Sequence, residues 1–241
     1  MGRLILFAFL IILISSGTIA QTSPAGQPSN DSDRVAFLVD FSDYTEGSVE
    51  DWLKSKGFKF EGGARDRRKL DLDIKDGALV LEAKKPVSGF WVDESADIKE
   101  FSKVRIEWGI LKYPRGASYE QGVRNEALIL YIFFGYDKVS SGSFLIPNSP
   151  YFIGLFLCKE ERLNHPYKGR YHHKGGRFVC VGKPKPNETV VSEFNLVEAF
   201  KTYFKKKEVP VISGISLGVD TSSSGDDGKA GAFIKSVEFI N

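Results

Sequence analysis

The sequence lacks a hydrophobic run long enough to cross a bilayer as a helix. Its longest unbroken apolar stretch, Leu4 to Ile14, has eleven residues, about half of the roughly 20 that a membrane-spanning helix needs. Arg3 precedes this stretch, and small or polar side chains lead to Ala20. The pattern predicts a secretory signal peptide, residues 1–20, and a secreted or periplasmic protein. Because no cysteine lies near the cleavage site, no membrane anchor is expected after cleavage.

An excess of charge of either sign is also missing. The chain has 33 Lys and Arg residues against 31 Asp and Glu residues. Loss of Arg3 with the signal peptide leaves 32 against 31, a net charge of +1. Proteins that bind nucleic acid usually carry a much larger basic excess. The balance therefore predicts that no nucleic acid is bound.

Cysteine is scarce, with only Cys158 and Cys180 in the chain. Both lie in apolar, strand-like runs. An oxidising compartment would permit a disulfide between them, but two buried thiols fit the same pattern, since a disulfide depends on a geometry that the sequence does not show. Both alternatives stay open at this point.

Internal repeats, a second linker and a catalytic signature are all missing. Residues 21–34 contain almost no large apolar side chain and are predicted to form a flexible linker. The rest, residues 35–241, is apolar-rich throughout and long enough for one β-sandwich domain. The absence of a catalytic signature favours a protein that is not an enzyme.

What the sequence does contain is a series of short β-branched and aromatic runs between turn signals. This pattern predicts an all-β fold, a two-sheet antiparallel β-sandwich of the jelly-roll type. In 103–112 one face is apolar and the other charged, as in a half-solvated strand. The predicted strands are 35–41, 78–84, 88–93, 103–112, 126–136, 150–159, 176–182, 188–194, 211–220 and 230–240.

Two of these strands, 127–134 and 151–158, are apolar on both faces. A helix, a loop or a ligand must therefore cover their second face. The single predicted helix, 195–206, is one candidate, because Asn195 is a good N-cap and Glu198 completes a capping box. Strand 211–220 has one face of small residues, which leaves room for close packing.

Four segments resemble a bacterial family known as domain of unknown function 3047. They are Asp40-Phe41 with Trp52, the run from Gly89 to Phe134, the segment VPVISGISLGVDTSSSG, and the closing strand AGAFIKSVEFI. The resemblance implies an exported jelly roll akin to carbohydrate-binding modules, with no known activity. The chain departs from the family at residues 122–126, where members commonly have Gly-Asp-Asp and this sequence has GVRNE.

The segment 159–177 has six basic residues against two acidic ones, and it holds all three histidines. Cations attract anions, and interleaved tyrosines offer stacking surfaces for sugars. The segment is therefore a candidate binding loop for an anionic polymer, although a solvated loop fits the same composition. Trp91, which shares a strand face with the polar Asp93, is a further candidate platform for a sugar, with core packing as the alternative. The predicted ligand-binding residues are Trp91, His165, Tyr167, Lys168, Arg170, Tyr171, His172 and His173.

The turn 220–228 spaces oxygen-bearing side chains in the rhythm of a Ca²⁺ loop. The predicted ligands are Asp220, Ser222, Ser224 and Asp226. The bidentate glutamate expected at the twelfth position is missing, since Gly231 stands there, and an ordinary turn has the same composition. A structural Ca²⁺ ion is thus one reading, and no other cofactor is expected.

Together these features favour a non-catalytic module that binds a glycan or an anionic cell-envelope polymer. A secreted polysaccharide-active enzyme is the first alternative. It would be lyase-like, because the run Tyr167 to Tyr171 is similar to a strand of some alginate lyases. An envelope module for protein–protein interaction is the second alternative.

Overall fold

A computed structural model describes residues 34–223 and 227–241. The predicted signal peptide and nearly all of the predicted linker lie outside the described residues. In the described part of the chain, no helix is long and apolar enough to span a membrane.

The described chain is mostly β-strand, with two short α-helices, α1 (Val49–Ser55) and α2 (Leu196–Phe204). The strands are β1 (Val35–Asp40), β2 (Lys59–Gly62), β3 (Leu70–Lys75), β4 (Ala78–Ala83), β5 (Ser88–Asp93), β6 (Lys103–Lys112), β7 (Glu126–Val139), β8 (Ser149–Leu157), β9 (Pro166–Tyr167), β10 (Gly176–Gly182), β11 (Thr189–Asn195), β12 (Ile212–Asp220) and β13 (Ala230–Ile240).

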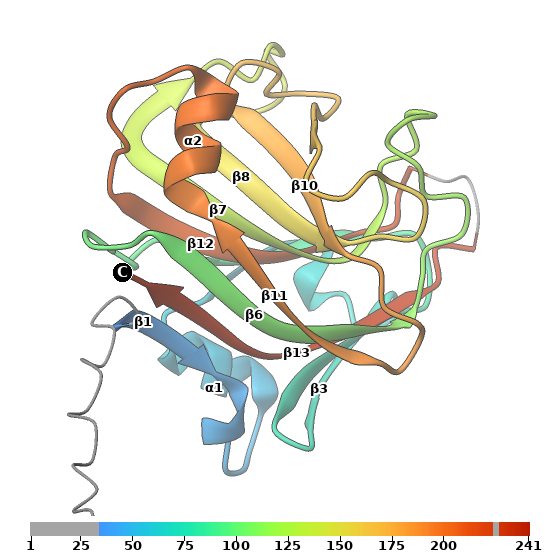
Figure 1. Cartoon of the computed structure of the whole chain (residues 1–241). Coiled ribbons are helices and arrows are strands. Elements are labelled where there is room, and N and C mark those ends of the chain that lie inside the picture. The colour runs from blue at the N-terminus through green and yellow to red at the C-terminus, as the bar shows by residue number, and fades with distance from the viewer. Residues whose placement is uncertain (1–33, 224–226) are drawn as a thin grey trace, which may run out of the picture. The chain divides into compact units, whose positions relative to one another are not determined.

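These strands form two sheets that pack face to face (Figure 1). The first sheet has the order β11-β6-β13-β4-β3, and β1 also pairs with β13. The second has the order β2-β5-β12-β7-β8-β10-β9. All pairings are antiparallel except β8 with β10, which run parallel. The predicted two-sheet sandwich is therefore confirmed, with one parallel pair that the prediction did not include.

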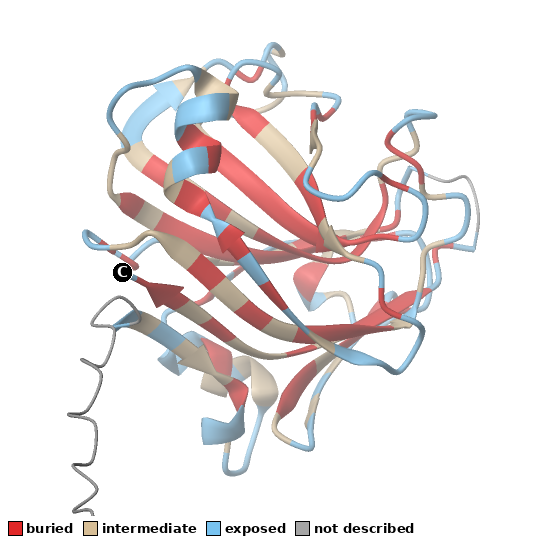
Figure 2. Cartoon of the chain, viewed as in Figure 1, coloured by how far each residue is buried: buried red, intermediate tan, exposed pale blue. Residues whose placement is uncertain are grey.

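The core lies between the two sheets, and alternation along the strands decides which side chains enter it (Figure 2). On β6 the predicted apolar face is buried, and the Trp108 indole N–H donates to Ser192 Oγ at 3.0 Å. On β7, Leu128, Leu130 and Ile132 point into the core. The intervening Ile129, Tyr131 and Phe133 must therefore lie on the outer face of the second sheet.

Helix α2 begins where the capping box predicted, because Asn195 Oδ1 accepts a hydrogen bond from the Glu198 N–H. The sequence analysis named this helix as one candidate to cover the second face of 127–134. In the structure it does not cover the outer face of β7. Its Phe200 packs on the core residue Phe134, with ring centroids 4.8 Å apart. Helix α1, which the sequence left unassigned, brings Trp52 against Phe41. Both helices thus pack against edges of the core, and neither covers the outer face of the second sheet.

Candidate ligand-binding cleft

The outer face of the second sheet carries a cleft with a volume of about 1050 Å³. Its floor comes from β5, β12, β7, β8 and β10, and its walls come from loops near residues 119–124, 147–150 and 169–172. A cavity of this size is at the upper end of the range for small-molecule sites.

The depth of the cleft comes from the small residues of β12. Gly214 and Ser216 line its floor, and Gly218 continues the same face. A Cβ atom on Gly218 would lie 3.0 Å from ring atoms of both Phe90 and Tyr131. The small face predicted from the sequence therefore gives the aromatic rings of the neighbouring strands room to lie over β12.

Aromatic side chains run across the floor from β5 to β10. Phe90 contacts Tyr131 edge to face, and Tyr131 stacks on Phe133 with centroids 6.2 Å apart. Phe152 and Phe178 continue this cluster on β8 and β10. Four of the five are only partly buried, and Phe152 alone is buried. The aromatic floor is therefore Phe90, Tyr131, Phe133, Phe152 and Phe178.

Beyond the aromatic floor, the outer face is covered by loops and forms a second hydrophobic cluster. Tyr119 stacks on Phe156 with centroids 5.1 Å apart, and Tyr167 packs beside it. Cys158 and Cys180 belong to this cluster and are joined in a disulfide. Of the two alternatives for the cysteines, the structure has the bridge. The second face of β7 and β8 is thus covered by loops at one end and open at the other.

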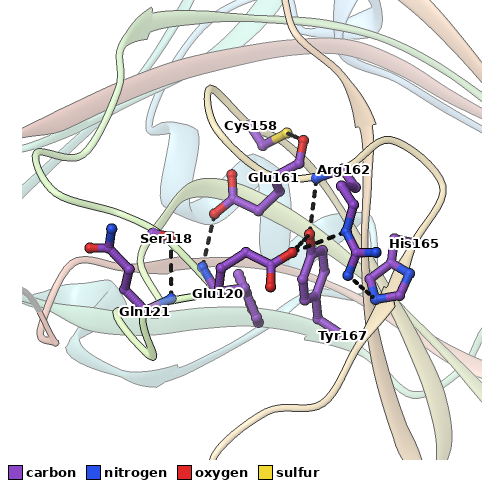
Figure 3. A network of polar contacts seen from close by, with 9 residues as sticks. Ser118, Glu120, Gln121, Cys158, Glu161, Arg162, His165 and Tyr167 are labelled. Atoms are coloured by element: carbon purple, nitrogen blue, oxygen red, sulfur yellow. Dashed lines mark hydrogen bonds and ion pairs between the residues drawn. The ribbon is translucent and has the colours of Figure 1, made fainter.

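A polar network ties these covering loops together (Figure 3). Tyr167 Oη donates to Glu120 Oε1 at 2.8 Å and accepts from the Arg162 N–H at 2.9 Å. The Arg162 guanidinium also pairs with Glu120, and its other arm contacts His165 Nε2 at 2.9 Å. Buried Glu161 accepts from the Tyr119 N–H at 3.1 Å. Tyr167, which was predicted to bind ligand, links this loop to the loop that holds Glu120, whereas His165 contacts Arg162 and Tyr167 within its own loop.

A buried carboxyl group stands where this covered region meets the cleft. Glu126, the first residue of β7, is 4% exposed and accepts a hydrogen bond from Tyr119 Oη. Burial raises the pKa of Glu126 to about 8, and the negative charges of Asp220 and Glu161 add to the rise. The hydrogen bond from Tyr119 and the positive charge of Arg124 act in the opposite direction. At neutral pH this carboxyl group is therefore largely protonated.

Next to Glu126, two polar groups keep hydrogen-bonding capacity to spare. Arg124 lines the cleft, and its Nε is buried without a hydrogen-bond partner among the described residues. Asn125 Oδ1 accepts from the Ser223 N–H, whereas its Nδ2 has no partner in the described chain. Unpaired buried donors are costly; of these two residues Arg124 lines the cleft, whereas Asn125 does not.

At the cleft wall formed by residues 169–172, the structure places three of the predicted binding residues, Arg170, Tyr171 and His172. The Arg170 guanidinium lies 5.5 Å from the Tyr171 ring centroid. His172 packs edge to face on Phe152, and burial lowers the pKa of His172. Lys168 and His173 are exposed and do not line the cleft. The segment 159–177 therefore divides into a structural half and a cleft-lining half.

Trp91 is not a sugar platform, which corrects the prediction. Its side chain is completely buried in the core, edge to face with Phe60. The polar neighbour that suggested exposure, Asp93, is itself buried, and its Oδ1 accepts hydrogen bonds from the N–H and Oγ of Ser95. Because side chains alternate along β5, the cleft receives Phe90 and Val92 instead.

Only part of the predicted Ca²⁺ site lies among the described residues. Asp220 Oδ1 accepts hydrogen bonds from the N–H and the Oγ of Ser222, at 2.9 and 2.6 Å. Ser224 and Asp226 lie outside the described residues. Among the residues that the structure describes, no cluster of three metal-ligating side chains occurs. The Ca²⁺ site stays a prediction.

No family model and no curated protein matches this chain, so the resemblance to domain of unknown function 3047 is not confirmed. Among solved structures, it is similar to family 29 carbohydrate-binding modules. One such module has 9% identity and a TM-score of 0.33, covering 76% of each chain. A mutant complexed with cellulohexaose has 10% identity and a TM-score of 0.36, covering 86% of this chain and 92% of the other. At these values neither fold nor ligand is inferred from the likeness.

Proposed function

We propose that the chain binds a carbohydrate polymer in the cleft on the outer face of the second sheet. The observation that carries the proposal is the aromatic floor. Sugar rings expose C–H groups that pack well on aromatic faces, and Tyr131 and Phe133 lie partly exposed at the centre of this floor. The cleft, about 1050 Å³ in volume, has room for more than one sugar unit.

Polar groups around the floor support the same class of ligand. Arg124, Asn148 and Ser222 line the cleft at different points of its rim and can bind hydroxyl groups. Ligand sites in proteins combine an apolar surface with a few such convergent polar groups. Lys138 and Arg170 add positive charge to the wall. Glu61 and Glu94 also line the cleft with negative charge, so an anionic group of a glycan would pair locally with Lys138 or Arg170.

Export to the cell envelope or the medium is part of the proposal. It is supported by the apolar run of residues 4–14 behind Arg3. The disulfide between Cys158 and Cys180 also supports it, because such bonds persist mainly in oxidising compartments. A bacterial family of exported jelly rolls, domain of unknown function 3047, remains the proposed relative.

A glycan array probed with the labelled chain tests the proposal. We expect binding to a subset of polysaccharides and at least a tenfold loss of affinity in Tyr131→Ala and Phe133→Ala, since stacked rings dominate such sites. Val191→Ala is the matched control, because Val191 is 59% exposed on the first sheet. Equal binding by all four proteins, with thermal melting unchanged, would contradict the proposal.

The exposed loop between β7 and β8 favours the second candidate, a protein-interaction module. Phe144 is 97% exposed and Leu145 is 74% exposed, and large apolar side chains in such positions often mark contact surfaces. If the array shows no glycan bound and Phe144→Ser abolishes capture of an envelope protein, this candidate replaces the first.

A further inference from the structure

Three loops meet at one end of the second sheet, at the top of Figure 1. Residues 140–148 join β7 to β8, residues 168–175 lead into β10, and residues 205–211 lead from α2 into β12. Strand pairing brings them together, because β10 begins beside the start of β8 and β12 begins beside the last part of β7. The His172 N–H also donates to the Ser141 carbonyl oxygen at 2.8 Å. We call this part of the sandwich the loop end.

The loop between β7 and β8 holds two large apolar side chains in solvent. Phe144 and Leu145 are more exposed than any other large hydrophobic side chain that the structure describes. The base of the loop is fixed by buried Ser141, whose N–H donates to Asn148 Oδ1 and whose Oγ donates to the Ile146 carbonyl oxygen at 2.6 Å. Adjacent apolar side chains fixed in this way at a loop tip indicate a contact surface.

The loop end is also basic. Its three loops, with the last residues of β7, contain seven Lys and Arg residues against two acidic residues, Asp137 and Glu208. All seven are exposed, and none forms an ion pair with a residue that the structure describes. Elsewhere, by contrast, Lys84 and Lys235 each pair with a carboxylate. The seven basic residues are Lys138, Lys168, Arg170, Lys174, Lys205, Lys206 and Lys207.

Other acidic residues at this end belong to the loop that follows β5. Glu94, Asp97 and Glu100 lie there, and the first two pair with lysines at 2.6 and 3.6 Å. In the order of the second sheet, β5 lies on one side of β12, whereas β7, β8 and β10 lie on the other. The uncompensated positive charge therefore lies on the side of the loop end that carries Phe144.

We propose that the loop end docks reversibly on the surface of a bilayer that contains anionic phospholipids. Phe144 and Leu145 insert among the headgroups, and the lysines lie close to the lipid phosphates. Apolar insertion and basic charge together give a firm attachment to a membrane surface, where one such contribution alone is weak. A lipid surface also suits lysine, because its ammonium group acts as a point charge that needs no fixed partner geometry.

This inference goes beyond glycan binding and does not depend on it. Asn148 and Arg170 belong to the loop end and also line the cleft. Docking would therefore hold the cleft beside the membrane surface.

Sedimentation with phospholipid vesicles tests the inference. Because the apolar run of residues 4–14 would itself bind lipid, the test uses the exported chain, with the loss of residues 1–20 checked by mass. We expect binding to vesicles made of equal parts of phosphatidylcholine and phosphatidylglycerol, and at least about tenfold weaker binding to phosphatidylcholine alone. Added salt should weaken the binding, since ions screen exposed charges.

The apolar part of the proposal is tested by Phe144→Ser/Leu145→Ser, which should bind the anionic vesicles at least about tenfold more weakly. The matched control, Leu38→Ser/Val191→Ser, removes two exposed apolar side chains from the first sheet and should bind as the wild type does. In Phe144→Trp, the added fluorescence should shift to the blue on anionic vesicles, because the indole leaves water.

The basic part is tested by Lys206→Ser/Lys207→Ser. This variant should lose roughly 20-fold in affinity for the anionic vesicles, since each lysine near such a surface adds to binding. Lys75→Ser/Lys84→Ser makes the same change in net charge beside the first sheet and should lose much less. All of these side chains are exposed, so the melting temperatures of the variants should stay close to that of the wild type.

Absence of binding to anionic vesicles, or equal binding by the wild type and the two loop-end variants, would overturn the inference. Capture of an envelope protein that Phe144→Ser abolishes, with vesicles left unbound, would also overturn it and assign the loop to a protein partner. Phe144→Ser/Leu145→Ser should still bind glycan, because neither side chain lines the cleft. A negative vesicle result would therefore leave the proposed function standing.

Discussion

Tyr119 Oη donates its hydrogen bond to Glu126, and the backbone N–H of the same tyrosine donates to Glu161. Tyr119 therefore links the first residue of β7 to the loop that follows Cys158. The disulfide anchors that loop on the parallel strand β10. The position of the buried acid thus depends on a covering layer that lies outside the main core.

The first prediction concerns the pH dependence of stability. The pKa of Glu126 is about 8 in the folded protein and about 4.3 in an unfolded chain, so the folded state binds the proton more tightly. Its contribution to the free energy of unfolding is complete below pH 4.3 and is lost as pH rises through 8. Urea unfolding should show the wild type losing on the order of 2–4 kcal/mol more than Glu126→Gln between pH 5 and pH 8.5.

Several other titratable or charged groups interact with Glu126, so the control variant must leave all of them in place. Asp220, Glu161, Arg124, Tyr119 and Tyr131 all interact electrostatically with Glu126. Glu82→Gln, which is remote from them, should keep the wild-type pH dependence. If Glu126→Gln lost as much stability as the wild type over this range, the protonated state of Glu126 would be ruled out.

The second prediction concerns the disulfide. Cys158 and Cys180 are 22 residues apart, and closing a loop of this size stabilises a protein by about 3 kcal/mol in the chain-entropy model. The double variant Cys158→Ala/Cys180→Ala should lose about this much free energy of unfolding. A reducing agent should lower the melting temperature of the wild type and leave that of the variant unchanged. Equal sensitivity of both proteins would refute the bridge.

The third prediction separates the two halves of the segment 159–177. Arg170 lines the cleft, whereas Lys168 and Lys174 are exposed outside it. Arg170→Gln should weaken binding of an anionic polysaccharide, and the loss should shrink at high salt because ions screen exposed charges. The matched control, Lys168→Gln/Lys174→Gln, removes two charges and should change affinity less. A greater effect of the control would place the ligand outside the cleft.

The fourth prediction follows from the buried position of Trp91. Trp91→Ala removes a fully buried indole from the core and should cost about 3–5 kcal/mol in the free energy of unfolding. Trp91→Phe should cost less and leave glycan affinity unchanged. Loss of affinity in a stable Trp91→Phe protein would restore a direct role for this residue.

Much of the fold could be predicted because the alternation of side chains is strong. On β6, the face of Val104 and Trp108 is apolar and its opposite face carries Arg105 and Glu107, so local pattern alone fixes the orientation. Strands β2 (Lys59–Gly62) and β3 (Leu70–Lys75) were not predicted. Both are short and rich in charge, and only their pairing with β5 and β4 defines them.

The site was harder to predict, because it depends on contacts between distant segments. The apolar second faces of 127–134 and 151–158 did indicate that something must cover the outer side of these strands. In the structure this outer side carries the aromatic floor. Glu126 and Asp220 each lie in segments that the family resemblance singled out, yet only the register of β7 with β12 brings them together. Trp91 was misassigned because a polar neighbour, Asp93, suggested exposure where Ser95 satisfies it locally.

A crystal structure of the chain with an oligosaccharide chosen from the array tests glycan binding in the cleft most directly. We predict sugar rings stacked on Tyr131 and Phe133, with hydroxyl groups hydrogen-bonded near Arg124. An oligosaccharide bound on the outer face of the first sheet, or only on the exposed loop that holds Phe144, would contradict it.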